Sequence, residues 1–400
     1  MKQVFVTQNF GPHWGGIDQR HVQLCRRFGS ERALDVCTVR TTHAEALSFD
    51  RSEPYRIIRQ PFTQRESKRF TNTLRWAAWL STHCARDVEL IHCGEIRPTS
   101  IAVWAAARRA HIPYILYVNG LDLLLEQRRA RVARLKMLAR ILLGGASGIV
   151  ANSAWTAEAA AEVMRVVGVK RHPPIAGIDL GTDPEQFHPL RDTGALRARL
   201  ALGDAPLLLT VGRLLPHKGQ DVTIRAFALL VREFPQLRYL IVGAGYHERA
   251  LRQLAADLGV AQHVLFETTL STRDVAEAHA TATVYVGPSR LHDEVNVEGF
   301  GLVFSEASAS GTAVVGGDSG GVRSAVRHGE TGLVVSPGDE HAVASAIREL
   351  LLDPGRREAM GQKGRALVET YYNWNRVATD TLEFAQSVLR TERAKKTSRK

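Results

Sequence analysis

Short β-rich apolar runs alternate with longer helical patterns along almost the whole chain. The runs that favour strands are Val4–Thr7, Leu34–Val39, Leu90–Cys93, Tyr114–Val118, Gly148–Ala151, Leu207–Val211, Tyr239–Val242, Val264–Glu267, Val284–Gly287, Ala313–Gly316 and Gly332–Val335. Helical patterns separate most of these runs, which is the order found in parallel sheets built from strand–helix–strand units. The alternation therefore predicts an α/β protein.

The pattern starts twice. A first strand leads into a glycine-bearing loop at residues 11–16, and Leu207–Val211 leads into a second such loop at residues 212–219. A chain of 400 residues also suits two domains better than one. We expect two Rossmann-like domains, residues 1–190 and 191–370, facing across a cleft at the carboxyl ends of their strands. A C-terminal helix at residues 371–390 is expected to cross back to the first domain, followed by a basic disordered tail at 391–400.

Charge and cysteine usage restrict the partners and the compartment. The net charge of +11 indicates an anionic partner, which means phosphates, an acidic membrane surface or nucleic acid. Nucleic acid ranks last and is not expected, because aromatic residues are not interleaved with the basic ones. The four cysteines form no C-x-x-C pair, which argues against zinc and favours a reducing cytoplasm.

The most informative motif is EGFG at residues 298–301, which follows a predicted strand and opens a helix. The first amides of that helix have no intrahelical acceptors, so a diphosphate suits the position. Two carboxylates, Glu298 and Glu306, flank this helix start, and beside a phosphate they would repel it unless they bind hydroxyl groups. Sugar hydroxyls are the natural partners. In the alternative interpretation, the acidic residues only complement the helix dipole, but this leaves the EGFG turn unexplained.

A second motif, GRLLPHKG at residues 212–219, follows the first strand of the second domain. Arg213 can bind a phosphate through two parallel hydrogen bonds, and Lys218 acts as a point charge. Such a pair would stabilise the negative charge that grows on a departing diphosphate. The alternative is a solvated basic loop. The spacing is not that of a Walker A loop.

Together, GRLLPHKG, VGAG, PSR, EGFGLVFSEASASGTAVVGGDSGG and GETGLVVSPGD resemble the donor-binding half of glycosyltransferase family 4. This family contains retaining enzymes of the GT-B fold, among them the phosphatidylinositol mannosyltransferases. The resemblance is dense over residues 205–340 and thin over the first domain. It implies a retaining hexosyltransferase that moves a sugar from a nucleotide-sugar donor to a lipid-linked or polysaccharide acceptor, as in lipopolysaccharide or exopolysaccharide biosynthesis.

The resemblance also implies roles for individual residues. Glu298 matches the glutamate that contacts the donor sugar, and Glu306 matches the one that binds the ribose. Arg213 and Lys218 match the basic pair on the diphosphate. The further donor-binding positions that it implies are Gly15, Gly16, Gly243, Gly299, Phe300, Gly301, Leu302 and Val303.

One position departs from the family. Asn119 stands where many relatives have a histidine beside the donor sugar. A carboxamide can hydrogen-bond a sugar hydroxyl, but it cannot carry charge or shuttle a proton. Asn119 is therefore either a catalytic contact or only a loop-shaping residue. Its presence also leaves open a catalytically silent nucleotide-sugar-binding protein, although the four charged donor-site residues are intact.

The mechanism expected from these residues needs no metal. The chain contains no Asp-x-Asp, and basic groups with helix amides can neutralise the leaving diphosphate. We therefore expect no cofactor. The donor is expected to be a UDP- or GDP-linked sugar, and the sequence identifies neither the base nor the sugar. The resemblance implies attack on the face that the leaving group departs from.

A basic segment, Gln127–Arg140, carries six positive and no acidic side chains. Such a helix could lie on an anionic bilayer, which would make the protein a peripheral one on the inner face of the membrane. The alternative, which we favour from the spacing, is a surface helix packed on the sheet in a cytoplasmic protein. Two histidines, His13 and His92, are expected on the acceptor side of the cleft.

Overall fold

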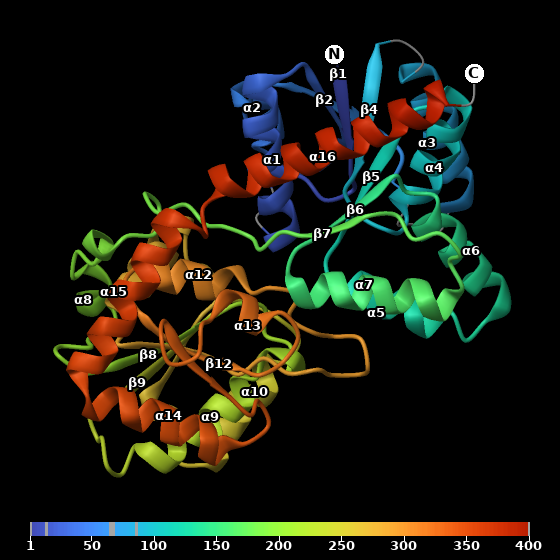
Figure 1. Ribbon diagram of the computed structural model, residues 1–400. Helices are drawn as coiled ribbons and strands as arrows, with labels where there is room; N and C mark the ends of the chain where they lie inside the picture. Colours follow the sequence, from blue (N-terminus) through green and yellow to red (C-terminus); the bar gives the residue numbers. More distant parts are fainter. Residues whose placement is uncertain (1, 13–14, 64–68, 85–86, 399–400) are drawn as a thin grey trace. The chain divides into compact units, whose positions relative to one another are not determined.

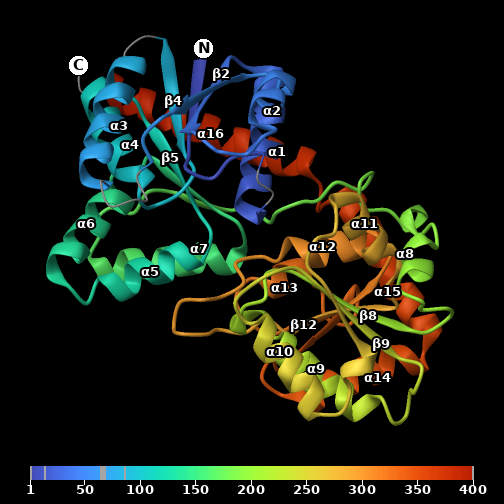
Figure 2. The ribbon, with the colours of Figure 1, turned by 180° about the vertical axis from the view of Figure 1, so that it is seen from behind.

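The computed structural model describes residues 2–12, 15–63, 69–84 and 87–398. The chain divides into two compact units, and the first is discontinuous in sequence. It comprises Met1–Asp179 together with Trp374–Lys400, and the second comprises Leu180–Asn373. Figures 1 and 2 show these units from opposite sides.

The first unit is built on a parallel sheet of seven strands in the order β3-β2-β1-β4-β5-β6-β7. Its strands are β1 Lys2–Val6, β2 Leu34–Val39, β3 Arg56–Gln60, β4 Val88–Cys93, β5 Tyr114–Val118, β6 Gly148–Ala151 and β7 Ile175–Gly177. Its helices are α1 Gly16–Glu31, α2 Ala46–Ser52, α3 Arg69–His83, α4 Thr99–Ala110, α5 Leu121–Arg129, α6 Ala133–Gly144, α7 Ala154–Val167 and α16 Trp374–Thr397. The central strands are buried on both faces, as the apolar runs predict.

The second unit has a parallel sheet of six strands in the order β10-β9-β8-β11-β12-β13. The strands are β8 Leu207–Val211, β9 Arg238–Val242, β10 Val264–Glu267, β11 Val284–Gly287, β12 Ala313–Gly317 and β13 Gly332–Val335. The α-helices are α8 Ala195–Arg199, α9 Gln220–Leu230, α10 Glu248–Asp257, α11 Thr272–Thr281, α12 Leu302–Ala309, α13 Val322–Ala325, α14 Glu340–Leu352 and α15 Pro354–Thr370. Short 3₁₀ turns occupy Pro189–Arg191, Pro216–Lys218 and Ala261–His263. Each sheet has its own hydrophobic core.

The second unit begins at Leu180, earlier than the boundary near residue 190 that the charged stretch suggested. The reason is that residues 180–187 pack on this unit. Thr182 N–H donates to the carbonyl of Tyr372 at 2.9 Å. The Arg365 guanidinium donates to the carbonyls of Pro184 and Phe187, both at 2.8 Å.

The last helix, α16, packs against α1 and β6 of the first unit, as the red and blue helices of Figure 1 show. The predicted disordered tail is wrong up to Thr397, because α16 continues that far. The helix is held beyond residue 391 by its own side chains, with Arg393 paired to Glu89 at 3.2 Å and Lys396 donating to the carbonyl of His111 at 2.9 Å.

The basic segment Gln127–Arg140 is not one helix. Helix α5 ends at Arg129 and α6 begins at Ala133, with Val132 extended between them. The basic and apolar positions of this segment therefore cannot be assigned to the two faces of one continuous helix. Among the described residues, none of the helices combines the length and apolar character needed to cross a bilayer.

Candidate functional site

The strand order of the second unit reverses between β8 and β11, which lie side by side. In open α/β sheets, ligands bind beyond the carboxyl ends of the strands at such a reversal. The loops that follow these two strands are residues 212–219 and 288–301. They contain six of the thirteen predicted site residues, namely Arg213, Lys218, Glu298, Gly299, Phe300 and Gly301.

An ion pair joins the two loops. The Lys218 ammonium lies 2.5 Å from a carboxylate oxygen of Glu298, and their side chains are 19% and 15% exposed. Partial burial strengthens the attraction relative to a pair in water. The two groups come from residues 80 positions apart in sequence, so the fold, and not local sequence, brings them together.

Three residues that the motifs did not assign hold these loops against each other. The Arg290 guanidinium pairs with Asp221 at 2.9 Å, and its backbone N–H donates to the carbonyl of His217 at 2.8 Å. Burial, together with the nearby Lys218 ammonium, lowers the pKa of the His217 imidazole to about 4, so His217 is neutral at pH 7. The PSR motif contains Arg290, but its partner could not be identified without the fold.

Glycines shape the backbone around Glu298. Gly320 has a φ of 58°, and a Cβ there would lie 2.2 Å from the carbonyl oxygen of Glu298. The Gly321 N–H donates to the same oxygen at 2.8 Å. Gly301 has a φ of 93° and is the N-cap of α12. These close approaches fix the position of Glu298 at the start of that helix.

Helix α12 starts where the motif predicts. Leu302 and Val303 are its first two residues, so their amides, with that of Gly301, have no acceptor one turn earlier. Phe300 is buried, and its ring packs edge-on against Tyr372 with the centroids 5.9 Å apart. Its side chain is therefore part of the interior. Gly299, between Glu298 and Phe300, is buried as well.

Glu306 lies within α12 and is buried, with 7% of its surface exposed. Its carboxylate is 3.6 Å from Nε2 of His279, which is also buried. The His279 ring stacks on Tyr285 and meets the edge of Phe187. The Glu306 carboxylate therefore lies beside α11, to which His279 belongs.

The loop after β9 packs directly on the basic loop. Gly243 has a φ of 135°, and a Cβ there would be 2.1 Å from the carbonyl oxygen of Gly212. The Leu214 N–H donates to the carbonyl of Ala244 at 3.0 Å. Arg213, which lies between Gly212 and Leu214 in sequence, is exposed. Within the described ranges its guanidinium forms no ion pair with an acidic side chain.

The other predicted residues belong to the first unit. Gly15 is the N-cap of α1 and Gly16 its first residue, and both are exposed. Asn119 follows β5, and its N–H donates to the Asp122 carboxylate at 2.9 Å. Burial raises the pKa of Asp122 to about 6, although the backbone hydrogen bonds from Asn119 and Leu123 oppose this.

A buried arginine lies below Asn119. The Arg20 guanidinium donates to Oδ1 of Asn119 at 2.8 Å. The sequence motifs did not select Arg20. Its position could have been a signal, because Arg20 is a charged residue among the apolar positions of the helix that follows Gly15 and Gly16. His92 is buried and bonded to Tyr117 and Gln3 in the interior, so the prediction that it lines the acceptor side is wrong. His13 lies outside the described residues.

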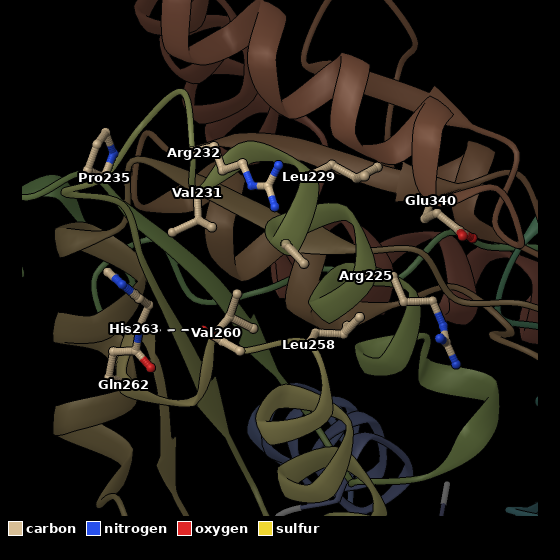
Figure 3. Close-up of a pocket in the computed structure, with 12 residues that line it drawn as sticks. Arg225, Leu229, Val231, Arg232, Pro235, Leu258, Val260, Gln262, His263 and Glu340 are labelled. Atoms are coloured by element: carbon tan, nitrogen blue, oxygen red, sulfur yellow. Dashed lines mark hydrogen bonds between the residues drawn. The ribbon is translucent and has the colours of Figure 1, made fainter.

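A surface hollow of about 750 Å³ lies elsewhere on the second unit. Figure 3 shows its wall of exposed side chains around α9, among them Arg225, Leu229 and Arg232. Below them, Val260 accepts a hydrogen bond from His263 N–H. None of the predicted donor-site residues lines this hollow, so we do not place the reaction there.

Comparison with known proteins identifies both halves of the chain. The profile described as "Glycosyltransferase Family 4" matches residues 14–175, and that described as "Glycosyl transferases group 1" matches residues 192–367. Among solved structures, that of Anabaena HepE in complex with UDP and glucose aligns with a TM-score of 0.78 at 21% identity. The alignment covers 97% of this chain and all of that one, which shows the GT-B fold.

Sequence relatives agree over nearly full length. The GDP-mannose-dependent alpha-(1-6)-phosphatidylinositol monomannoside mannosyltransferase of Mycobacterium tuberculosis is 32% identical over 386 residues, covering 95% of this chain and 97% of the relative. The D-inositol 3-phosphate glycosyltransferase of Streptomyces avermitilis is 31% identical over 305 residues, covering 72% of this chain and 63% of the relative. The chain therefore belongs to glycosyltransferase family 4 and is a nucleotide-sugar-dependent glycosyltransferase of the GT-B fold.

Proposed function

We propose that this protein transfers a sugar with retention, and without a metal ion, from a nucleotide sugar to a lipid-linked acceptor. The observation that carries the proposal is the Lys218–Glu298 pair at the carboxyl edge of the second sheet, beside the start of α12. Arg213 is exposed at the same edge. Two cations and a set of helix amides are the groups that a departing diphosphate requires.

Each residue has a role in this proposal. Arg213 and Lys218 bind the diphosphate, and the amides of residues 301–303 bind its distal phosphate. Glu298 accepts hydrogen bonds from hydroxyls of the transferred sugar, and Glu306 accepts those of the ribose. Glu298 must leave Lys218, in part or wholly, when the donor enters.

The chemical step follows from these roles. The bond between the sugar's anomeric carbon and the diphosphate oxygen breaks, and the acceptor hydroxyl forms the new bond on the same face. The acceptor proton passes to the leaving phosphate oxygen. This path needs no second carboxylate as nucleophile, which a double displacement would require.

The donor can be identified by thermal unfolding of the purified protein with UDP, GDP, ADP and their sugar conjugates, without divalent metal. Because relatives are named as GDP-mannose-dependent, we expect GDP and GDP-mannose to raise the unfolding temperature most. Transfer to a phosphatidylinositol glycolipid should then give the α-anomer by NMR. A β-linked product would contradict retention. Donor binding without hydrolysis or transfer to any acceptor would favour the catalytically silent alternative, which Asn119 suggests.

We also propose peripheral contact with an anionic membrane through α6, on the cytoplasmic side. Val132, Met137 and Ile141 are large apolar side chains exposed here, Met137 by 53%. Arg134 and Lys136 are exposed among them. Figures 1 and 2 both place α6 at the outside of the first unit. Basic and apolar groups mixed in this way suit the interface of a bilayer.

Reversing the charges of Arg134 and Lys136 to glutamate is expected to weaken binding to phosphatidylglycerol vesicles by at least about tenfold. Co-sedimentation at several salt concentrations measures it. The matched control is the same double reversal at Arg225 and Arg232, which lie around the hollow of Figure 3. Equal losses from both pairs would mean that only net charge matters, and α6 would not be the contact.

A further inference from the structure

Arg20 is a buried cation below the carboxyl edge of the first sheet. The residue is 1% exposed. Its guanidinium lies over the Tyr117 ring, 4.9 Å from the centroid, and reaches the carbonyls of Val118 and Val150 only at 3.4 Å. Its short hydrogen bond, 2.8 Å, is the one to Oδ1 of Asn119. Burial lowers the pKa of the guanidinium to about 10, so it is charged at neutral pH.

This contact determines which way the Asn119 amide points. A guanidinium has only donors, so the end of the amide that faces Arg20 must be the carbonyl oxygen. The Nδ2 group then points away from Arg20. It is buried, and within the described part of the chain it has no hydrogen-bond partner.

The backbone of Asn119 is fixed as well. Its N–H donates to the Asp122 carboxylate, which also accepts from Leu123 N–H at 3.0 Å. Both ends of the residue are therefore held, and the remaining group is a donor. A buried donor without a partner is costly in the folded protein, which a bound ligand would relieve.

We propose that Arg20 is a positioning residue, which fixes Asn119 with its amide N–H₂ directed at an oxygen of a bound sugar. The inference rests on the proposed function and adds a residue to it. The polarity is directional, because Arg20 turns Oδ1 toward itself, and the group that remains to contact the sugar is the N–H₂ donor. The sugar is that of the donor or of the acceptor, and the experiment separates the two.

A simpler interpretation is that Arg20 only braces β5 and β6 through the carbonyls of Val118 and Val150. The distances argue against it, since both carbonyl contacts are 3.4 Å and the contact with Asn119 is 2.8 Å. Contacts with these two carbonyls alone would also not account for the shorter bond to Asn119. The two interpretations differ in a measurable way, because a brace acts independently of the Asn119 side chain.

The first arm tests the donor group alone. Asn119→Asp keeps the shape and still accepts from Arg20, but it loses the N–H₂. We expect affinity for the intact nucleotide sugar to fall about tenfold, with affinity for the free nucleotide unchanged, if the oxygen belongs to the donor sugar. If it belongs to the acceptor, the KM for the acceptor rises instead and donor hydrolysis is unaffected. Unchanged values of all three would overturn the proposal.

The second arm is a double-mutant cycle of Arg20→Met and Asn119→Ala. If Arg20 acts through Asn119, adding Arg20→Met to Asn119→Ala costs no further activity. Additive losses would show a brace. Arg20→Lys, which retains a buried donor, should recover part of the kcat lost in Arg20→Met. If Met at this position prevents folding, Arg20→Lys takes its place in the double-mutant cycle.

Arg26→Met is the matched control, because Arg26 is on the same helix but is paired with Glu53 at 2.7 Å. Its kinetic constants should equal those of the wild type. If the wild-type protein binds no nucleotide sugar, the proposed function itself is wrong, and this result is distinct from any result on Arg20. Wild-type transfer together with an additive cycle refutes only the role of Arg20.

Discussion

Replacing Glu298 with glutamine should lower the rate of sugar transfer by about two to three orders of magnitude and should tighten binding of the free nucleoside diphosphate severalfold. The first effect follows from the loss of a charged acceptor for sugar hydroxyls near the reacting carbon. The second follows from the ion pair, because Lys218 is held 2.5 Å from Glu298 and becomes free for phosphate once that charge is removed. Single-turnover rates and calorimetry of GDP and UDP measure the two effects separately.

Glu306→Gln is the matched comparison, since it neutralises a carboxylate in the same helix region. Here we expect free-nucleotide affinity to fall by about tenfold, because the proposed contact is to the ribose. The signs of the two effects on nucleotide binding should therefore be opposite. If both variants weaken nucleotide binding equally, the division of roles between the two glutamates is wrong.

Arg213→Met should reduce transfer by about two orders of magnitude or more, with a smaller loss of nucleotide affinity. The guanidinium is proposed to stabilise charge that grows on the leaving diphosphate, so its largest effect falls on the transition state. Arg213 is exposed, so the unfolding temperature without ligand should not change. Arg213→Lys should recover only part of the rate, because an ammonium cannot form the paired hydrogen bonds of a guanidinium.

The control is Arg225→Met. Arg225 is an exposed residue of α9 that lines the hollow of Figure 3. Its transfer rate should equal that of the wild type. A rate loss in Arg213→Met that merely matches the loss of nucleotide affinity would indicate ground-state binding only, and the proposed role in the chemical step would then be withdrawn.

Much of the fold could be predicted because the strands that carry the cores are continuous apolar runs. All eleven runs that favour strands coincide with strands of the two sheets, except that Thr7 lies one residue beyond β1. Two edge strands were missed for physical reasons. In β3, Arg56 and Arg59 interrupt the apolar pattern, and β7 has only three residues. An edge strand has one neighbour and more solvent, so its sequence is less constrained.

The residues of the candidate site also fall into those that the sequence could predict and those that it could not. Residues in one loop or helix start, such as Glu298 and Gly301, were found because a local motif contains them. Contacts made by the tertiary fold, such as Arg20 with Asn119 and Arg290 with Asp221, were not, because the partners are 99 and 69 positions apart. The hydrophobic pattern also missed the break between α5 and α6, since the basic side chains continue through it.

The return of α16 to the first unit has a consequence for biosynthesis. Gly148 of β6 lies where a Cβ would meet Val388 at 2.8 Å and Phe384 at 3.0 Å, so this helix covers part of the first sheet. Domains tend to fold as they leave the ribosome, the N-terminal one first. Here the N-terminal unit cannot bury that surface until residues 374–397 have been translated, after the whole of the second unit. A nascent chain must therefore carry an open apolar face while the second unit is synthesised, and expression of residues 1–179 alone would leave that face in water.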